Sequence, residues 1–226
     1  MGIPVAIKNS DTVEVVDSTD APIVEGVTSP AGEQPARRSA TRELLETLVI
    51  AALLFFGMRM VMPAVVVDGV SMVPSLQNAQ HLLENRLAYR NIEIGGKKFY
   101  LFHAPKRGDI VVINPPIAHD KPFIKRIIGL PGDTILIRDG NVMVNGVALH
   151  ETNISEAPRY TYPLNGRAYT LGPDEYFVLG DNRNASEDSH FFGPIHSSAI
   201  MGETWVSFWP WKDIGFLPHP VYPIPS

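Results

Sequence analysis

The chain has 226 residues, enough for one sizeable domain with appendages, and carries a net charge of -5. This mild acidity argues against a nucleic-acid-binding protein, which normally shows a basic surface, and the absence of cysteine excludes disulfides, thiolate catalysis and cysteine-ligated zinc. Twenty prolines and eighteen glycines indicate many turns and short strands rather than a helical bundle.

The first stretch, residues 1–36, is acidic, contains many proline, serine, threonine and glycine residues, and has no aromatic residue. A segment of this composition cannot bury enough apolar surface to offset the entropy that it would lose on ordering. We therefore expect residues 1–36 to form a disordered tail.

A long apolar run follows, and between residues 47 and 67 its one charged side chain is Arg59. A helix of about 20 residues spans the roughly 30 Å hydrocarbon core of a bilayer. The arginines that precede the run are Arg37, Arg38 and Arg42. The pattern predicts a single transmembrane anchor with a basic flank at residues 37–64. Pro63 and the valines after it predict that the helix ends there and a strand begins.

The apolar run has two other interpretations. A cleaved signal peptide is disfavoured because a long tail precedes the run and no small-x-small cleavage site follows it. The interpretation of the run as a core helix of a soluble protein stays open. If the run is an anchor, the arginines before it place the N-terminus in the cytoplasm and everything after Val67 outside. The expected location is the cell (plasma) membrane, with an organelle membrane of bacterial descent left open.

Beyond the anchor, apolar and β-branched runs alternate with turn signals, which predicts β-strands. The expected strands are residues 109–114, 134–138, 142–144, 175–179 and 203–209. Asp139-Gly140 and Asn145-Gly146 predict tight hairpin turns. After Val67, no segment long enough for a helix has apolar residues at helical spacing.

The predicted fold is therefore mostly β, with antiparallel sheets forming a distorted, barrel-like domain at residues 65–217. Residues 91–102 and 151–170 are expected to be inserted loops or hairpins. The proline-rich residues 218–226 are expected to form an extended, mobile tail.

Ser71 lies just after the apolar run, among small residues and three positions before Pro74. A serine hydroxyl is a poor nucleophile until a base takes its proton. None of the seven histidines lies in a recognisable triad motif, and Gly69-x-Ser71-x-Val73 lacks the second glycine of a nucleophile elbow. His190 stays open as an alternative base, although a structural or surface role is favoured. No His-x-x-x-His with a nearby acid occurs, so no metal site is expected.

Lys125 is a candidate base because Phe123, Ile124 and Ile127 surround it. Burial among such side chains disfavours the ammonium form and lowers the pKa of a lysine, so that a neutral amine is available near pH 7. The alternative is a solvated Lys-Arg pair formed with Arg126. A buried Arg126 would need an acidic partner, and Asp181 and Asp188 are the candidates.

Four blocks together resemble those of type I signal (leader) peptidases, which are membrane-anchored serine/lysine endopeptidases. The blocks are residues 71–76, 107–111, 125–133 and 180–193. With the anchor, the resemblance covers roughly residues 40–212. It implies that Ser71 is the nucleophile, that neutral Lys125 is the general base, and that the Ser71 backbone N–H donates to the oxyanion.

The resemblance also implies supporting roles. Ser186 would orient Lys125, and Gly180 would leave room beside it. An ion-pair shell would consist of Asp181, Arg126 and Asp188. Substrate-binding positions would be Val67, Gly69, Met72, Leu76, Phe123 and Ile124. The implied substrates are secretory preproteins, bound as an extended strand and cut after Ala-x-Ala, with the lipid membrane as a further partner and no nucleic acid, metal or cofactor.

Three positions depart from the usual family pattern. Ser75 replaces a common threonine, and His190 replaces a common arginine. Gly69 stands where some members have a serine whose hydroxyl completes the oxyanion hole. Two other functions stay open: a related peptidase that acts on itself or on one dedicated client, and an anchored β-domain that binds extended peptides without cutting them.

Overall fold

The computed structural model describes residues 40–95 and 97–224. The first 44 residues form one unit, and the chain from Leu45 onward forms a second. The predicted disordered tail at residues 1–36 lies outside the described residues and stays a prediction.

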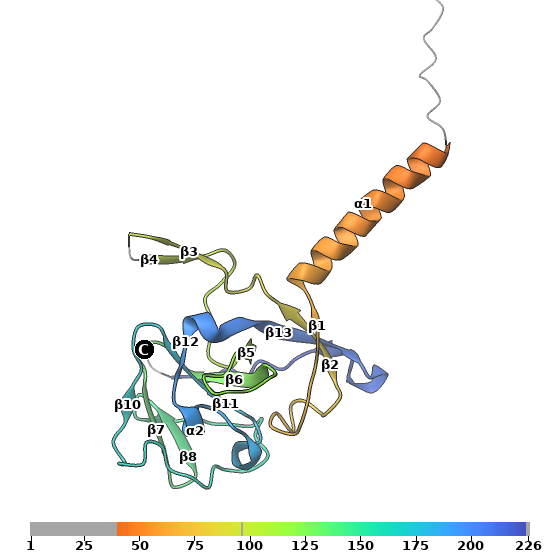
Figure 1. Ribbon diagram of the computed structural model, residues 1–226. Helices are drawn as coiled ribbons and strands as arrows, with labels where there is room; N and C mark the ends of the chain where they lie inside the picture. Colours follow the sequence, from red (N-terminus) through yellow and green to blue (C-terminus); the bar gives the residue numbers. More distant parts are fainter. Residues whose placement is uncertain (1–39, 96, 225–226) are drawn as a thin grey trace, which may run out of the picture. The chain divides into compact units, whose positions relative to one another are not determined.

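Helix α1 (Ala40–Val61) is the apolar run predicted as an anchor (Figure 1). An 18-residue window within its 22 residues has a mean hydropathy of 2.0, and no side chain in the helix is buried. At 1.5 Å per residue the helix is about 33 Å long, which matches the roughly 30 Å of a hydrocarbon core. Within the described part of the chain it is the one helix long and apolar enough to cross a membrane. Its exposed apolar surface argues against a helix buried in a soluble core.

The larger sheet has eight antiparallel strands and curls into a half-barrel. Its main path runs through β1 (Ala64–Val66), β2 (His81–Asn85), β13 (Ile200–Trp209), β5 (Ile110–Ile113), β6 (Phe123–Gly129), β11 (Glu175–Leu179) and β12 (Ile195–His196), and β14 (Gly215–Phe216) pairs with β13. Strand β13 shifts register against β2 and against β5. Such irregularities bend and twist a strand, which accounts for the curl.

Two smaller sheets complete the β structure. The first has four strands in the order β10 (Tyr169–Thr170), β7 (Thr134–Arg138), β8 (Asn141–Val144) and β9 (Val147–Ala148). The second is the hairpin of β3 (Asn91–Ile94) and β4 (Lys97–Tyr100). The turns Asp139-Gly140 and Asn145-Gly146 have positive φ at every residue, as two-residue hairpin turns require.

Short helical turns lie between the strands. They are η1 (Arg183–Ala185), α2 (Ser189–Phe192), η2 (Ser197–Ala199) and η3 (Trp211–Asp213). Three buried apolar clusters fill the interior. One of them places Met72 and Leu76 against Leu82 and Ile110, and it fixes the segment that contains Ser71.

The predicted fold class is confirmed. Strands β2 and β6 are absent from the predicted strands, because His81, Glu84 and Asn85 interrupt the apolar pattern of β2, and Lys125 and Arg126 interrupt that of β6. The expected mobility of the C-terminal tail stays a prediction, although the tail contacts the domain at residue 222. There Tyr222 is buried, and its hydroxyl donates a hydrogen bond of 2.9 Å to Asn153 Oδ1.

Candidate active site

Ser71 lies in the connection between β1 and β2, and hydrogen bonds hold this connection on both sides. The Ser71 carbonyl accepts a hydrogen bond from Asn182 N at 2.9 Å, and Asn182 Nδ2 donates to the Val70 carbonyl at 3.2 Å. The Gly69 N–H donates to Asn78 Oδ1 at 2.8 Å. The backbone of Ser71 therefore has a defined position against the segment that follows β11.

Lys125 occupies the third position of β6, and only 3% of its surface is exposed. Its amine donates a 3.0 Å hydrogen bond to Ser186 Oγ and lies 5.1 Å from the centre of the Phe123 ring. Burial lowers the pKa of Lys125 to about 8, although the charges of Asp188 and Glu187 act in the opposite direction. A neutral amine is therefore accessible near neutral pH.

Gly180 follows β11 and lies where Ser186 and the Ser71 backbone come together. A Cβ atom at this position would overlap both the Ser186 hydroxyl and the Ser71 carbonyl oxygen. The Gly180 N–H donates to Asp188 Oδ2 at 2.9 Å, which fixes the glycine itself. The absence of a side chain at Gly180 is thus what allows the two serines to approach each other.

Ser71 and Lys125 line the same pocket, which has a volume of about 450 Å³. Of the predicted substrate-binding positions, Val67, Gly69, Met72, Phe123 and Ile124 line it as well. Leu76 does not line it: this side chain is fully buried in the apolar cluster beneath the Ser71 segment. Lining residues that the sequence reasoning missed are Val65, Val66, Asp68, Val70, His119, Lys121, Pro122, Ala185 and Glu187.

Arg126 is fully buried and forms a two-pronged ion pair with Asp181. Its Nε atom lies 2.8 Å from Asp181 Oδ1, and its Nη2 atom lies 2.7 Å from Asp181 Oδ2. The Nη1 atom donates to the Gly108 carbonyl at 2.7 Å, and Asn153 Nδ2 donates to Asp181 at 2.9 Å. This is a bidentate arginine–carboxylate pair, in which two N–H···O bonds fix the orientation of the side chains and the opposite charges compensate each other.

Asp188, the second predicted partner of Arg126, has a different role. Its side chain caps helix α2 by accepting a hydrogen bond from His190 N at 3.1 Å, and it lies 2.7 Å from His190 Nδ1. The carboxylate that directly precedes this short helix therefore serves as its cap, and the predicted supporting role of Asp188 stays a prediction.

The alternative base, His190, does not line the Ser71 pocket. Its ring stacks on Tyr160 at 3.8 Å between centroids, and its Nδ1 atom is occupied by Asp188. The histidine among the pocket-lining residues is His119, whose Nδ1 atom lies 3.2 Å from Lys121 N and whose ring packs edge-on against Phe123. Neither histidine is placed as Lys125 is.

A second buried ion pair was missed by the sequence reasoning. Arg183 donates to both carboxylate oxygens of Glu151, at 2.7 and 2.6 Å, and its Nε atom donates to the Gly180 carbonyl at 3.0 Å. This pair supports Gly180 from the side opposite Asp188. The two residues are 32 positions apart, and no periodic pattern in the sequence links them.

Among the described residues, one group could hold a metal ion: Asp109, Glu203 and His219, whose candidate ligand atoms lie within 4.8 Å of one another. It does not line the Ser71 pocket. Asp109 Oδ2 already accepts hydrogen bonds from the Tyr89 hydroxyl and from Lys106 N, both at 2.8 Å.

Comparisons with known proteins match most of the chain. The family model described as "Signal peptidase, peptidase S26" matches residues 41–209. A probable signal peptidase I-2 from Synechocystis is 40% identical over 183 residues, which are 77% of this chain and 76% of the relative. A signal peptidase I from Leptolyngbya laminosa is 35% identical over 202 residues, or 85% and 92%. A signal peptidase I from Bacillus caldolyticus is 34% identical over 163 residues, or 67% and 81%.

Proposed function

The chain belongs to the signal peptidase family, peptidase S26, and we propose that Ser71 and Lys125 are its catalytic pair. It is a serine endopeptidase that removes signal peptides. The observation that carries the assignment of the pair is the placement of Lys125: a buried amine with a pKa of about 8 lines the same pocket as Ser71.

In the proposed reaction, neutral Lys125 accepts the hydroxyl proton of Ser71 as the Ser71 oxygen bonds to the scissile carbonyl carbon. The ammonium of Lys125 then gives this proton to the leaving amine as the carbon–nitrogen bond breaks. Water, deprotonated by the same lysine, hydrolyses the resulting ester and restores Ser71. No metal or other base is required for either half of the reaction.

Ser186 and the Ser71 backbone are assigned supporting roles. The Ser186 hydroxyl accepts a hydrogen bond from Lys125, which directs the amine. The Ser71 N–H would donate to the oxyanion, and loss of one such donor typically costs about 3 to 4 kcal/mol. The Gly69 N–H is bonded to Asn78, so it does not supply the second donor in this conformation.

The substrate is proposed to bind as an added strand. Strand β1 lies at one end of the larger sheet, so one of its edges is free, and Val65 and Val66 of this strand line the Ser71 pocket. An extended peptide paired there would place alternate side chains into a pocket with the apolar walls Val67, Met72 and Ile124. These features support a preference for substrates with small residues before the cleaved bond, in the pattern Ala-x-Ala.

The proposed topology is a single pass through the plasma membrane, with the N-terminus in the cytoplasm and the peptidase domain outside. Its support is the basic flank formed by Arg37, Arg38 and Arg42 before helix α1. The proposed divisions are a tail at 1–36, an anchor at 37–64, a peptidase domain at 65–217 and a C-terminal segment at 218–226.

The test is cleavage of a preprotein with an Ala-x-Ala site by the detergent-solubilised full chain. We expect Ser71→Ala and Lys125→Ala to be folded and inactive. Lys121→Ala is the matched control, because Lys121 lines the same pocket but is exposed and paired with Asp68 at 2.6 Å. A Lys125→Ala variant with a near-wild-type rate would overturn the assignment of the base. Failure of the wild type to cut any preprotein would favour a peptide-binding module.

A further inference from the structure

The β3–β4 hairpin has two unlike faces. Side chains alternate along a strand, and the register pairs Ile92 with Phe99 and Glu93 with Lys98. Lys98 binds Asp174 and lies 3.3 Å from Ser197 Oγ, so its face is tied to the domain. The opposite face holds the pairs Ile92–Phe99 and Ile94–Lys97 and is mostly apolar: Ile92 is 58% exposed, and Phe99 is 55% exposed.

The apolar surface extends beyond one pair of residues. Further exposed side chains of the hairpin and of the segment that follows it are Ile94, Leu101 and Phe102, each between 62% and 65% exposed. Five large apolar side chains on one short, projecting element are costly in water. The hairpin therefore has the composition of a surface that is covered in the working protein.

A backbone hydrogen bond joins the segment before the hairpin to the end of helix α1. Arg86 N donates to the carbonyl of Val61, the last residue of α1, at 3.1 Å. From Arg86 the chain runs directly to Asn91, where β3 begins. Leu101 N donates to the Arg90 carbonyl at 2.7 Å and closes the base of the hairpin. If α1 crosses the bilayer, the hairpin begins close to the point where the chain leaves it.

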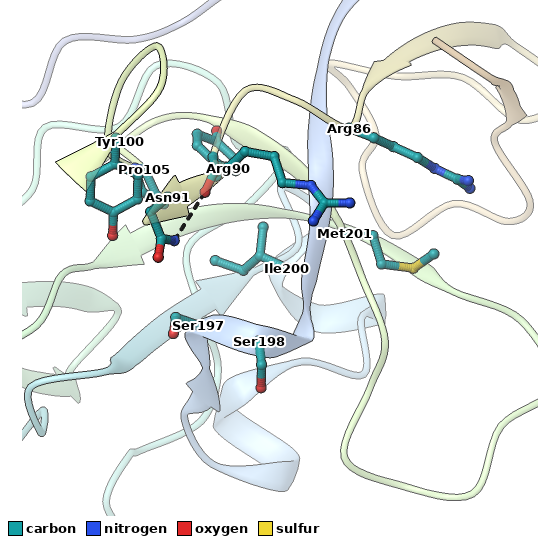
Figure 2. Close-up of a pocket in the computed structure, with 10 residues that line it drawn as sticks. Arg86, Arg90, Asn91, Tyr100, Pro105, Ser197, Ser198, Ile200 and Met201 are labelled. Atoms are coloured by element: carbon teal, nitrogen blue, oxygen red, sulfur yellow. Dashed lines mark hydrogen bonds between the residues drawn. The ribbon is translucent and has the colours of Figure 1, made fainter. Parts of the chain in front are cut away.

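Two arginines lie beside the hairpin: Arg90, and Arg86, whose Nε atom lies 3.2 Å from Glu84 Oε2. Arg86 and Arg90 line a pocket of about 450 Å³ at the base of the hairpin, together with Tyr100, Ser197 and Ser198 (Figure 2). Both guanidinium groups point away from Tyr100 in this view. Apolar side chains flanked by basic ones are typical of elements that lie in the interface of a membrane with anionic lipids.

We propose that the β3–β4 hairpin is a second membrane contact. Its apolar face lies in the headgroup region and the outermost part of the acyl chains, and Arg86 and Arg90 lie against anionic headgroups. The contact holds the peptidase domain against the bilayer that α1 crosses. This proposal rests on the anchoring helix and on the hairpin, and it is independent of the assignment of Ser71 and Lys125.

The absence of cysteine makes a direct test possible, because a single introduced cysteine labels one site. Phe99→Cys in the full chain is labelled with the environment-sensitive fluorophore NBD and reconstituted into vesicles that contain doxyl-labelled lipid. The matched control is Leu164→Cys, an apolar position that is 94% exposed and lies between β9 and β10. We expect blue-shifted and strongly quenched fluorescence at position 99, and neither change at position 164. Equal, weak quenching at both positions would overturn the proposal.

The headgroup contact is tested with vesicles of phosphatidylglycerol and of phosphatidylcholine. Quenching at position 99 should be at least twofold stronger in phosphatidylglycerol, and Arg90→Gln should remove most of this difference. Arg159→Gln, at an exposed arginine paired with Glu156, should leave it intact. Equal quenching in both lipids would overturn the role of the arginines. Disulfide-linked dimers of unlabelled Phe99→Cys without lipid quenching would assign the apolar face to a second copy of the chain.

Cleavage of a short soluble peptide in detergent separates this proposal from the proposed function. The hairpin does not line the Ser71 pocket, so Arg90→Gln and labelled Phe99→Cys should cut such a peptide at the wild-type rate. Loss of lipid quenching with intact cleavage would reject the hairpin contact alone. Lipid quenching in a chain that cuts nothing would reject the catalytic assignment alone.

Discussion

The amine of Lys125 lies 3.0 Å from the hydroxyl of Ser186, although the two residues are 61 positions apart in the sequence. Strand β6 brings one of them, and the turn after β11 brings the other. Because β6 and β11 are hydrogen-bonded neighbours in the larger sheet, the contact is a direct product of the sheet order. The position of the proposed base is therefore fixed by the fold rather than by a flexible side chain alone.

Removal of the Ser186 hydroxyl should lower the rate without unfolding the protein. A single hydrogen bond to a neutral amine contributes about 1 kcal/mol, so we expect Ser186→Ala to reduce kcat by roughly fivefold. The KM value should change little, because the hydroxyl is proposed to orient the base rather than to bind the substrate. Steady-state cleavage of an Ala-x-Ala peptide measures both constants. Ser198→Ala, at an exposed hydroxyl paired with His196, is the matched control. A kcat equal to that of the wild type would contradict the orienting role.

The pH dependence of cleavage should report the lysine. The active form of Lys125 is the neutral amine, and its pKa is lowered to about 8 by burial. As the pH falls through 8 the amine is protonated, so kcat/KM should fall about tenfold per pH unit below that value and level off above it. A midpoint between pH 6 and 7 would instead indicate a histidine.

A variant near the pocket tests the direction of this effect. The charge of Glu187 raises the pKa of Lys125, in opposition to burial. Glu187→Gln should therefore move the midpoint of the kcat/KM profile to lower pH. Since Glu187 is exposed, solvent screens its charge, and we expect a shift of a fraction of a unit. An upward shift would contradict the proposed titration of Lys125.

Much of this arrangement could be predicted from the sequence, for identifiable reasons. The burial of Lys125 follows from its apolar neighbours in the chain, and Arg126 next to it required an acid, which Asp181 supplies. The place of Asp188 at a helix cap could not be predicted, because charge alone does not distinguish an ion-pair partner from a helix cap. The pairing of Arg183 with Glu151 joins a turn to a loop, and no local pattern records such a contact.

The position of Gly180 should not tolerate even one methyl group. A Cβ atom there would overlap the Ser186 hydroxyl and the Ser71 carbonyl, and overpacking of this kind costs about 1 to 3 kcal/mol. Gly180→Ala should lower both kcat/KM and the melting temperature, because the two catalytic segments are pushed apart. In Gly172→Ala the new Cβ would lie 3.4 Å from the nearest atom of Glu175, so this variant should be close to wild type in both respects. Equal effects of the two variants would show that the spacing at Gly180 is not critical.

The last prediction concerns the pair Arg126 and Asp181, both of whose side chains are fully buried. Asp181→Asn leaves the guanidinium buried without a countercharge, and breaking such a pair typically lowers the free energy of unfolding by about 3 to 5 kcal/mol. Replacing both residues, in Arg126→Met with Asp181→Leu, removes the unpaired charge and should restore part of the lost stability.

Urea denaturation of the full chain in detergent measures these differences. Asp139→Asn, at an exposed aspartate 3.5 Å from Arg138, is the matched control and should change stability by less than about 0.5 kcal/mol. The double variant should nevertheless cut more slowly than the wild type, because Arg126 also donates to the Gly108 carbonyl, and Asp181 also accepts from Asn153. A double variant no more stable than Asp181→Asn would mean that these additional hydrogen bonds, rather than the ion pair, dominate the contribution of the two residues.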